Sequence, residues 1–363
     1  MDKENKNCFE LKIHGLFTKA ISKLIAVFVF SALFPLSIIA EENASGKFSY
    51  ETLRYICTLN GENLKTLVEF RIPDGYTIIA ENAFYGCSKL KKITIPNGIL
   101  SIESKAFSYC ESLENITIPS SVKSLAIGIF YECRNLSHIN IDAGNLKYSS
   151  EDGILFNKTK STLLLCPEGF SGNYVIPEGV SSIGDQAFYN CRNLKNVTIP
   201  NSLISIGHQA FYNCEKLIEA VIPYSVMSIG EKSFCRCENL KQINIPGSVI
   251  SISKGSFLGC KNLEKLTIQD GVKIIENEAF KGCSSLEVVL IPKSIERIGA
   301  WVFSGCKNLE SVTMEAYDPP SISVGVFDYN VLGFKIHVPP TSLCAYKTSF
   351  SWYDYANYID PLN

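Results

Sequence analysis

The stretch from Gly184 to Val226 reads GDQAFYNCRNLKNVTIPNSLISIGHQAFYNCEKLIEAVIPYSV, and one pattern occurs in it twice. Phe188 and Phe211 stand 23 residues apart, and a cysteine follows each of them three residues later, as Cys191 and Cys214. Repetition at a fixed period of about 20 to 50 residues is the signature of a repeat protein. The stretch therefore predicts a chain built from stacked copies of one short unit.

The same unit extends in both directions from this stretch. The consensus is V-x-x-I-x-x-x-A-F-x-x-C-x-x-L-x-x-I-x-I-P, and its phenylalanine recurs in nine units, at Phe84, Phe107, Phe130, Phe188, Phe211, Phe234, Phe257, Phe280 and Phe303. The cysteine and the leucine keep their spacing from it in every unit. The period lapses once, because Cys133 and Cys191 are 58 residues apart.

Two parts of the unit have different structural signals. The L-x-x-I-x-I part alternates with period two, which predicts a short strand with its isoleucines on the inner face and a proline at its end. The I-x-x-x-A-F-x-x-C part is too short for a stable helix, and we expect a helical or 3₁₀ turn there. One coil cannot close a core, but stacked coils can, with neighbouring strands paired in a parallel sheet about 4.8 Å apart.

The composition excludes several classes of protein. The chain has 363 residues, of which 46% are hydrophobic, and a formal net charge of -2. This charge removes the basis for a nucleic-acid binder that neutralises phosphates. Nine of the 14 cysteines share the repeat register, so we predict free, buried thiols rather than metal pairs. Cys235 replaces the usual tyrosine beside this register, and pairing of Cys57, Cys166 or Cys344 stays open.

The chain divides into four segments. Residues 1–40 carry a basic stretch and an apolar run from Leu24 to Ala40, which predict a secretory signal peptide cleaved after Ala40; an uncleaved anchor is the alternative. Residues 41–72 are predicted to cap the N-terminal end, and residues 73–318 to form the repeats, with irregular coils at about 142–177 inserted in one continuous solenoid. Residues 319–363, rich in aromatic side chains, are predicted to cap the other end.

No enzyme signature emerges. His138, His208 and His337 lie in unrelated positions of different units, and neither a nucleophile elbow nor a phosphate-cradling glycine loop is present. Cys235 and Cys237 form the one close cysteine pair, and a metal site would need a second pair. We therefore expect a protein without catalytic activity, cofactor or metal.

The strand residues between the buried ones should point outward and form two rows on one face. The rows are mostly polar and uncharged, with an apolar spot at Val288 and Leu290. This candidate binding face consists of Lys92, Thr94, Asn115, Thr117, His138, Asn140, Asn196, Thr198, Glu219, Val221, Gln242, Asn244, Lys265, Thr267, Val288, Leu290, Ser311 and Thr313. The alternative is a solvated sheet surface with no partner.

The repeated phrase closely resembles the BspA-like, or Treponema pallidum type, leucine-rich repeats. Gly184 to Val226 fits that pattern, and the segments 152–158 and 163–167 resemble an irregular unit of the family. The tail around Val338, Tyr346 and Trp352 resembles its closing segment. The resemblance implies an α/β-type leucine-rich-repeat solenoid, a right-handed superhelix with a parallel sheet of short strands and mostly irregular or short helical outer turns.

For function, the resemblance implies a secreted or surface-displayed protein that binds other molecules, by adhesion to a host or to microbial surfaces. We expect a protein or glycan ligand, no nucleic acid, and no membrane insertion of the mature chain once the signal is removed. Two rival functions stay open. One is a structural or self-assembling envelope protein, which light scattering would detect, and the other is a secreted hydrolase with an unrecognised site.

Overall fold

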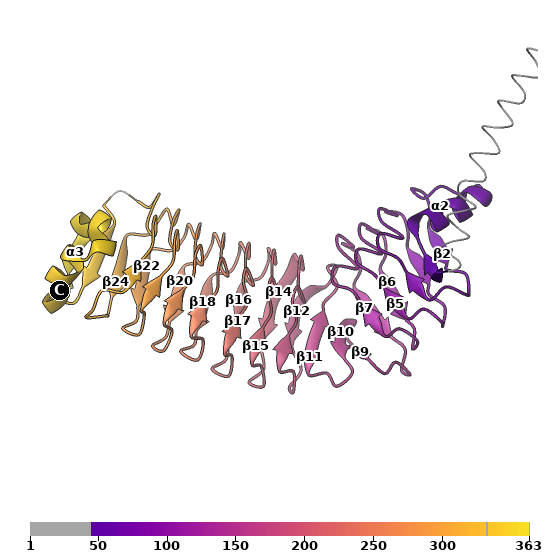
Figure 1. Cartoon of the computed structure of the whole chain (residues 1–363), viewed down its shortest axis with the longest axis horizontal. Coiled ribbons are helices and arrows are strands. Elements are labelled where there is room, and N and C mark those ends of the chain that lie inside the picture. Colours follow the sequence, from indigo (N-terminus) through magenta and orange to yellow (C-terminus); the bar gives the residue numbers. More distant parts are fainter. Residues whose placement is uncertain (1–44, 332, 363) are drawn as a thin grey trace, which may run out of the picture.

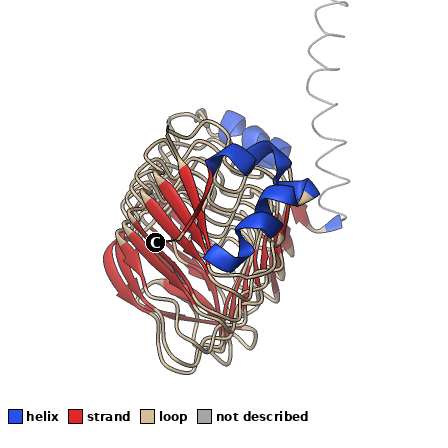
Figure 2. Ribbon diagram, turned by 90° about the vertical axis from the view of Figure 1, so that its left-hand side faces the viewer, coloured by secondary structure: helices blue, strands red, loops and turns tan. Residues whose placement is uncertain are grey.

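The computed structural model describes residues 45–331 and 333–362, and they form a solenoid of stacked coils (Figure 1). Viewed along the stack, the strands gather on two sides of the cross-section and loops form the rest (Figure 2). The predicted signal peptide lies outside the described residues. Within them, no helix has the length and apolarity needed to cross a membrane.

The L-x-x-I-x-I segments form the predicted parallel strands. Ile116 and Ile118 are buried while Asn115 and Thr117 between them are exposed, as the period of two requires. The strands on this side of the solenoid, which we call the long strands although β16 has only two residues, are β2 (Glu69–Arg71), β4 (Lys92–Thr94), β6 (Asn115–Ile118), β8 (His138–Ile141), β12 (Ser171–Val175), β14 (Asn193–Thr198), β16 (Glu219–Ala220), β18 (Gln242–Ile245), β20 (Lys265–Ile268), β22 (Val288–Ile291), β24 (Ser311–Met314), β26 (Lys335–Val338) and β27 (Ile359–Pro361).

A second parallel sheet, which the sequence pattern did not predict, runs along another side of the solenoid. Each of its strands has only two residues, such as Ser205–Ile206, whose isoleucine is the consensus residue five before the phenylalanine. These short strands are β1 (Lys47–Phe48), β3 (Ile78–Ile79), β5 (Ser101–Ile102), β7 (Ser124–Leu125), β13 (Ser182–Ile183), β15 (Ser205–Ile206), β17 (Ser228–Ile229), β19 (Ser251–Ile252), β21 (Ile274–Ile275), β23 (Arg297–Ile298) and β25 (Ser321–Ile322).

The turn around each phenylalanine is neither helical nor 3₁₀, so that expectation is wrong. In all nine units the residues two before and two after the phenylalanine have positive φ, as at Gln209 (53°) and Asn213 (60°). Gln209, Phe211 and Asn213 donate their N–H groups to carbonyls of the next coil at 2.6–2.9 Å, and the Tyr212 N–H bonds within the coil, to the Gln209 carbonyl at 3.1 Å. The alternation satisfies the buried backbone by joining coil to coil, which a helix would not do.

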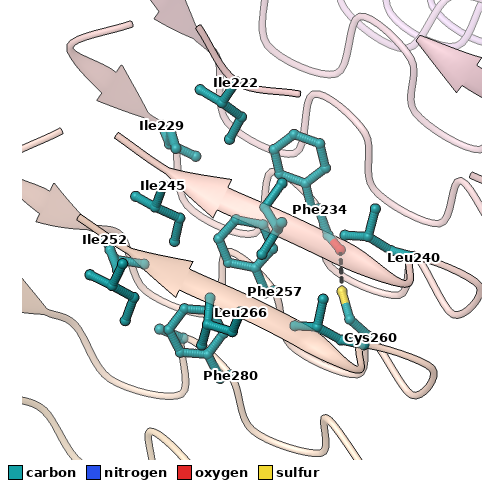
Figure 3. Packing of buried hydrophobic residues seen from close by; sticks show 14 of the residues in the cluster. Ile222, Ile229, Phe234, Leu240, Ile245, Ile252, Phe257, Cys260, Leu266 and Phe280 are labelled. Atoms are coloured by element: carbon teal, nitrogen blue, oxygen red, sulfur yellow. Dashed lines mark hydrogen bonds between the residues drawn. The ribbon is translucent and has the colours of Figure 1, made fainter. Parts of the chain in front are cut away.

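The phenylalanines form the central column of the core (Figure 3). From Phe188 to Phe303 the rings stack with centroids 4.8–5.5 Å apart and planes within 10° of parallel. Phe48 and Phe327 extend the stacking beyond the nine units. Burying each such ring contributes about 1.5–3 kcal/mol, so the column is a principal source of stability.

The cysteine column has a defined role in the stack. Seven of its nine thiols donate a hydrogen bond to the phenylalanine carbonyl of the preceding coil, as Cys260 does to Phe234 at 3.2 Å (Figure 3). A small side chain with a weak donor therefore suits this site better than alanine. All thirteen described cysteines are free, and only Cys344 is exposed.

Burial should make these thiols unreactive in the folded protein. It raises the pKa of Cys260 well above its usual range and that of Cys235 to about 11, which depletes the reactive thiolate. We expect iodoacetamide at pH 8 to modify Cys344 at least about 100-fold faster than either of these thiols. Peptide mapping by mass spectrometry would measure the rates, with a urea-unfolded sample as control. Equal rates in the native protein would contradict the buried column.

The lapse in the period is an antiparallel meander rather than irregular coils. It consists of β9 (Tyr148–Glu151), β10 (Ile154–Asn157) and β11 (Thr162–Leu165), after which β11 pairs in parallel with β13. Asp152 and Gly153 both have positive φ and close the β9–β10 hairpin, as a type I′ turn requires. The expected coils do not form because this hairpin folds each strand back on its neighbour.

The meander divides the solenoid into two arms with separate cores. One core runs from Phe48 to Leu155 and the other from Ile154 to Ile359. We call the coils through β8 the N-terminal arm and those from β12 onward the C-terminal arm. The stack bends where the meander lies between them (Figure 1).

Helical segments lie at both ends of the stack. At the N-terminal end, α2 (Tyr50–Leu59) begins at Ser49, whose hydroxyl accepts the Thr52 N–H. At the C-terminal end, η1 (Pro340–Ser342), α3 (Leu343–Thr348) and η2 (Phe350–Tyr358) precede β27. Trp352 is fully buried and donates its indole N–H to the Pro320 carbonyl at 2.8 Å, which ties this segment to the last coils.

Candidate binding face

The long strands carry the predicted face because their register is maintained from coil to coil. Asn115 lies opposite His138, and Thr117 lies opposite Asn140. In the C-terminal arm, Gln242 lies opposite Lys265 and Val288 opposite Ser311. The two predicted rows are therefore real columns within each sheet. Strand pairing breaks between β4 and β6 and between β20 and β22, and the meander separates His138 and Asn140 from the residues that begin at Asn196.

The rows are longer than the sequence predicted. Asn173 and Val175 on β12 lie opposite Asn196 and Thr198. Glu69 and Arg71 on β2 extend the rows at one end, and Lys335 and His337 on β26 extend them at the other. The predicted rows did not include these residues because their units lack the phenylalanine and cysteine that mark the period.

Polar side chains on this face bond to one another across coils. The Asn196 amide donates to Asn173 Oδ1 at 2.9 Å, and the Gln242 amide donates to Glu219 Oε1 at 2.6 Å. Such ladders hold the side chains in fixed orientations while leaving their remaining donors and acceptors free for solvent or a ligand.

Two shallow hollows interrupt the face, one in each arm. The hollow in the N-terminal arm is about 550 Å³ and includes four predicted residues, Lys92, Thr94, Asn115 and Thr117. The hollow in the C-terminal arm is about 220 Å³ and includes Glu219, Gln242 and Lys265. Both contain acidic and basic side chains, so neither has a single sign of charge.

The predicted apolar spot is present on β22. The side chains of Val288 and Leu290 are 55% and 47% exposed, on a strand whose Val289 and Ile291 are fully buried. Val221, just beyond β16, is also exposed, but Asn244 and Thr267 separate it from Leu290 in the row. The spot is therefore limited to two neighbouring side chains surrounded by polar ones.

Residues considered for chemistry do not assemble into a reaction centre. His138, His208 and His337 remain on different coils, and His138 contacts the Ser137 hydroxyl at 2.9 Å. Burial raises the pKa of Cys235, which is the opposite of what a nucleophile or metal ligand needs. Among residues 45–331 and 333–362, no three His, Cys, Asp or Glu side chains are placed to hold a metal ion.

With the coil geometry established, sequence comparison identifies the repeat. The BspA type leucine-rich repeat region matches six copies, at residues 61–169, 170–287 and 250–352. The chain belongs to the BspA-type leucine-rich repeat family. No curated protein matches it significantly.

Solved structures of leucine-rich-repeat proteins resemble this chain. A leucine-rich repeat protein from Eubacterium ventriosum is 26% identical with a TM-score of 0.61, over 74% of this chain and 84% of that one. A leucine-rich cell surface protein from Faecalibacterium prausnitzii is 29% identical with a TM-score of 0.50, over 68% of this chain and 60% of its own length. The pneumococcal antigen PcpA is 21% identical (TM-score 0.55, covering 82% and 67%) and shows the shared fold.

Proposed function

We propose that this BspA-type protein is a secreted or surface-displayed binding protein without catalytic activity, and that it adheres to protein or glycan on a host or microbial surface. The observation that carries the proposal is the pair of rows on the long strands, kept in register by parallel pairing within each sheet. A rigid array of polar side chains suits many modest contacts with an extended ligand, and it loses little conformational entropy on binding. The cell-surface description of the Faecalibacterium prausnitzii relative also supports it.

Secretion is tested on the intact gene product. We expect expression in a bacterial host with a Sec pathway to release a chain whose first residue is Glu41, because the apolar run ends at Ala40. N-terminal sequencing of the extracellular protein would show this. A full-length chain retained in the membrane would instead support the uncleaved anchor.

Binding through the sheet face is tested with a double substitution on the apolar spot. Val288→Asp with Leu290→Asp places two charges at the centre of any contact there, and we expect the affinity for a captured matrix protein or glycan to fall at least about tenfold, which corresponds to about 1.4 kcal/mol. Surface plasmon resonance would measure it, with ligands first found by screening matrix proteins, glycans and bacterial surfaces.

The matched control changes two exposed apolar residues off this face. Ile204 and Met227 are 49% and 66% exposed and lie beside short strands rather than in the two rows. Ile204→Asp with Met227→Asp should leave the affinity unchanged. Loss of binding in this control, or full binding by the Val288/Leu290 variant, would contradict a role for the sheet face.

A further inference from the structure

A pocket of about 290 Å³ lies where the two arms meet, away from the sheet face. Leu125 on β7 lines it from the N-terminal arm, and Tyr148, Leu155, Leu164 and Leu165 on the meander line it opposite. The strand β7 ends one short-strand sheet and β9 ends the next, so the regular ladder is broken between them. The antiparallel meander cannot continue that ladder, and the space between the sheets stays open.

The stacked ring column is also interrupted here. Phe130 stacks on Phe107 at 5.6 Å, and it has no other ring contact among the described residues. The aromatic contacts of the C-terminal arm begin with Phe170, Tyr174 and Phe188. Phe130 lines the pocket. A flat apolar group entering the pocket would therefore meet an aromatic ring against which, within the described part of the chain, no aromatic ring other than Phe107 is packed.

The pocket also has a polar part of its lining, which includes Tyr131, Gln186 and Glu168. The Tyr131 hydroxyl donates to Gln186 Oε1 at 2.6 Å, and the Tyr131 and Tyr189 rings are 5.2 Å apart. Glu168 lines the same pocket and is only 9% exposed. Its Oε1 accepts the Glu132 N–H at 3.0 Å, while its buried Oε2 has no hydrogen-bond partner. A buried carboxylate oxygen without a donor is rare and often marks a functional site.

The charges around Glu168 favour a positively charged group. Arg192, whose charge acts on Glu168, is already bonded to Glu132 at 3.2 Å and to Glu215 at 3.3 Å, and Asp185 also lines the pocket. Burial, together with the charge of Glu132, raises the pKa of Glu168 to about 7, while the Glu132 N–H, Arg192 and the side chain of Asn190 lower it. At pH 8 the carboxyl group is therefore mostly ionised, and it lacks a cation of its own.

We propose that the pocket binds a small amphipathic amine, with its apolar body against the leucines and Phe130 and its ammonium group donating to Glu168. The volume is near the lower end of the range of about 300–1,000 Å³ typical of small-molecule sites, which suits a body of one or two rings. The ammonium would offset the buried charge of Glu168, whose carboxyl group would turn to bring Oε2, now buried without a donor, toward the pocket. This site is independent of the sheet face and of the adhesion proposed above.

Three probes with one body and different head groups test the proposal on the full chain at pH 8. Calorimetry would compare 2-naphthylmethylamine, 2-naphthalenemethanol and 2-naphthoate. We expect the amine to bind at least about tenfold more tightly than the alcohol, and the carboxylate not to bind. Equal affinity for all three, or no binding of the amine up to about 1 mM, a Kd at which binding is already weak, would overturn the proposal.

Two substitutions locate the binding. Glu168→Gln should remove the preference for the amine over the alcohol, and Leu164→Trp should abolish binding of both by filling the pocket. Glu219→Gln, on the sheet face, is the matched control and should change nothing. Thermal unfolding would check each fold, and Leu164→Trp decides the result if Glu168→Gln does not fold. Unchanged amine binding in a folded Leu164→Trp protein would place the probe elsewhere and overturn the proposal.

Discussion

Phe257→Ala should lower the free energy of unfolding by about 3–5 kcal/mol, the largest effect expected of a single substitution in this chain. Phe257 is fully buried, and its ring stacks on Phe234 and Phe280 with centroids 5.3 Å away on both sides. Alanine would lose the buried area and both stacking contacts and would leave a cavity in a column that repeats along the stack. Urea denaturation followed by circular dichroism would measure the loss.

The same substitution at Phe350 is the matched control. Phe350 is 98% exposed at the start of η2, so Phe350→Ala should change the free energy of unfolding by less than about 0.5 kcal/mol. Because repeat proteins are stabilised by contacts between neighbours, the Phe257 variant could also unfold in two steps, which would show as a lower slope. A loss below about 1 kcal/mol would contradict the stacked column.

Gly169→Ala is the second substitution expected to lower the free energy of unfolding strongly. Gly169 lies at the junction of the two arms. A Cβ atom at Gly169 would lie 2.6 Å from the Leu136 carbonyl oxygen and 2.7 Å from the carbonyl carbon of Asn135. Both are backbone atoms that cannot move aside, and the Gly169 N–H donates to the same Leu136 oxygen at 2.8 Å. We expect a loss of about 1–3 kcal/mol in the free energy of unfolding, with faster proteolysis of the junction.

Gly144→Ala provides the comparison for this prediction. Gly144 lies shortly before the meander, and a Cβ atom there would meet only the Ser120 side chain at 3.4 Å or more. The added methyl should be tolerated within about 0.5 kcal/mol. Equal effects of the two substitutions in urea denaturation and limited proteolysis would show that Gly169 is not a steric constraint between the arms.

The repeated part of the fold could be predicted because one pattern carries its signal many times. Phe188, Cys191 and Leu194 recur at fixed spacing, and each occupies the same buried position in its coil. The alternation in L-x-x-I-x-I also fixed which side chains face outward, so the two rows of the candidate binding face follow directly from the sequence. Whether these rows bind anything depends on a partner, and a strand pattern does not specify one.

The rest of each coil carried weaker signals. A strand of two residues such as Ser205–Ile206 is too short to show a period, and it forms only because the next coil supplies its partner. The left-handed positions could have been suspected from Gly86, Gly259 and Gly282, two residues after the phenylalanine. Tyrosine, asparagine, glutamate and arginine occur at this position in other units, and hydrogen bonds such as Arg236 N–H to the Leu258 carbonyl stabilise them there against their own preference.

The pocket between the arms was beyond the reach of a sequence argument. The Asp152–Gly153 turn and the strand at Ile154 were recognisable, but antiparallel pairing depends on contacts between β9, β10 and β11 that a period does not reveal. Leu164 and Glu168 come together with Leu125 only because the ladder breaks at the meander. Irregular segments of this kind are where tertiary contacts, rather than local preference, determine the structure.

The contacts between neighbouring coils are nearly the same throughout the C-terminal arm, and this has a consequence for how the chain can evolve. Along the C-terminal arm, the N–H groups of the phenylalanine turns donate to the next coil, most column thiols donate to the preceding one, and the phenylalanines recur at a constant spacing of 23 residues from Phe188 to Phe303. Recombination between two units that removes or adds one whole period would rejoin equivalent turns and leave every other coil undisturbed. The outer surface would then gain or lose a single strand, about 4.8 Å of reach, so natural variants of this protein are expected to differ in length by multiples of one unit.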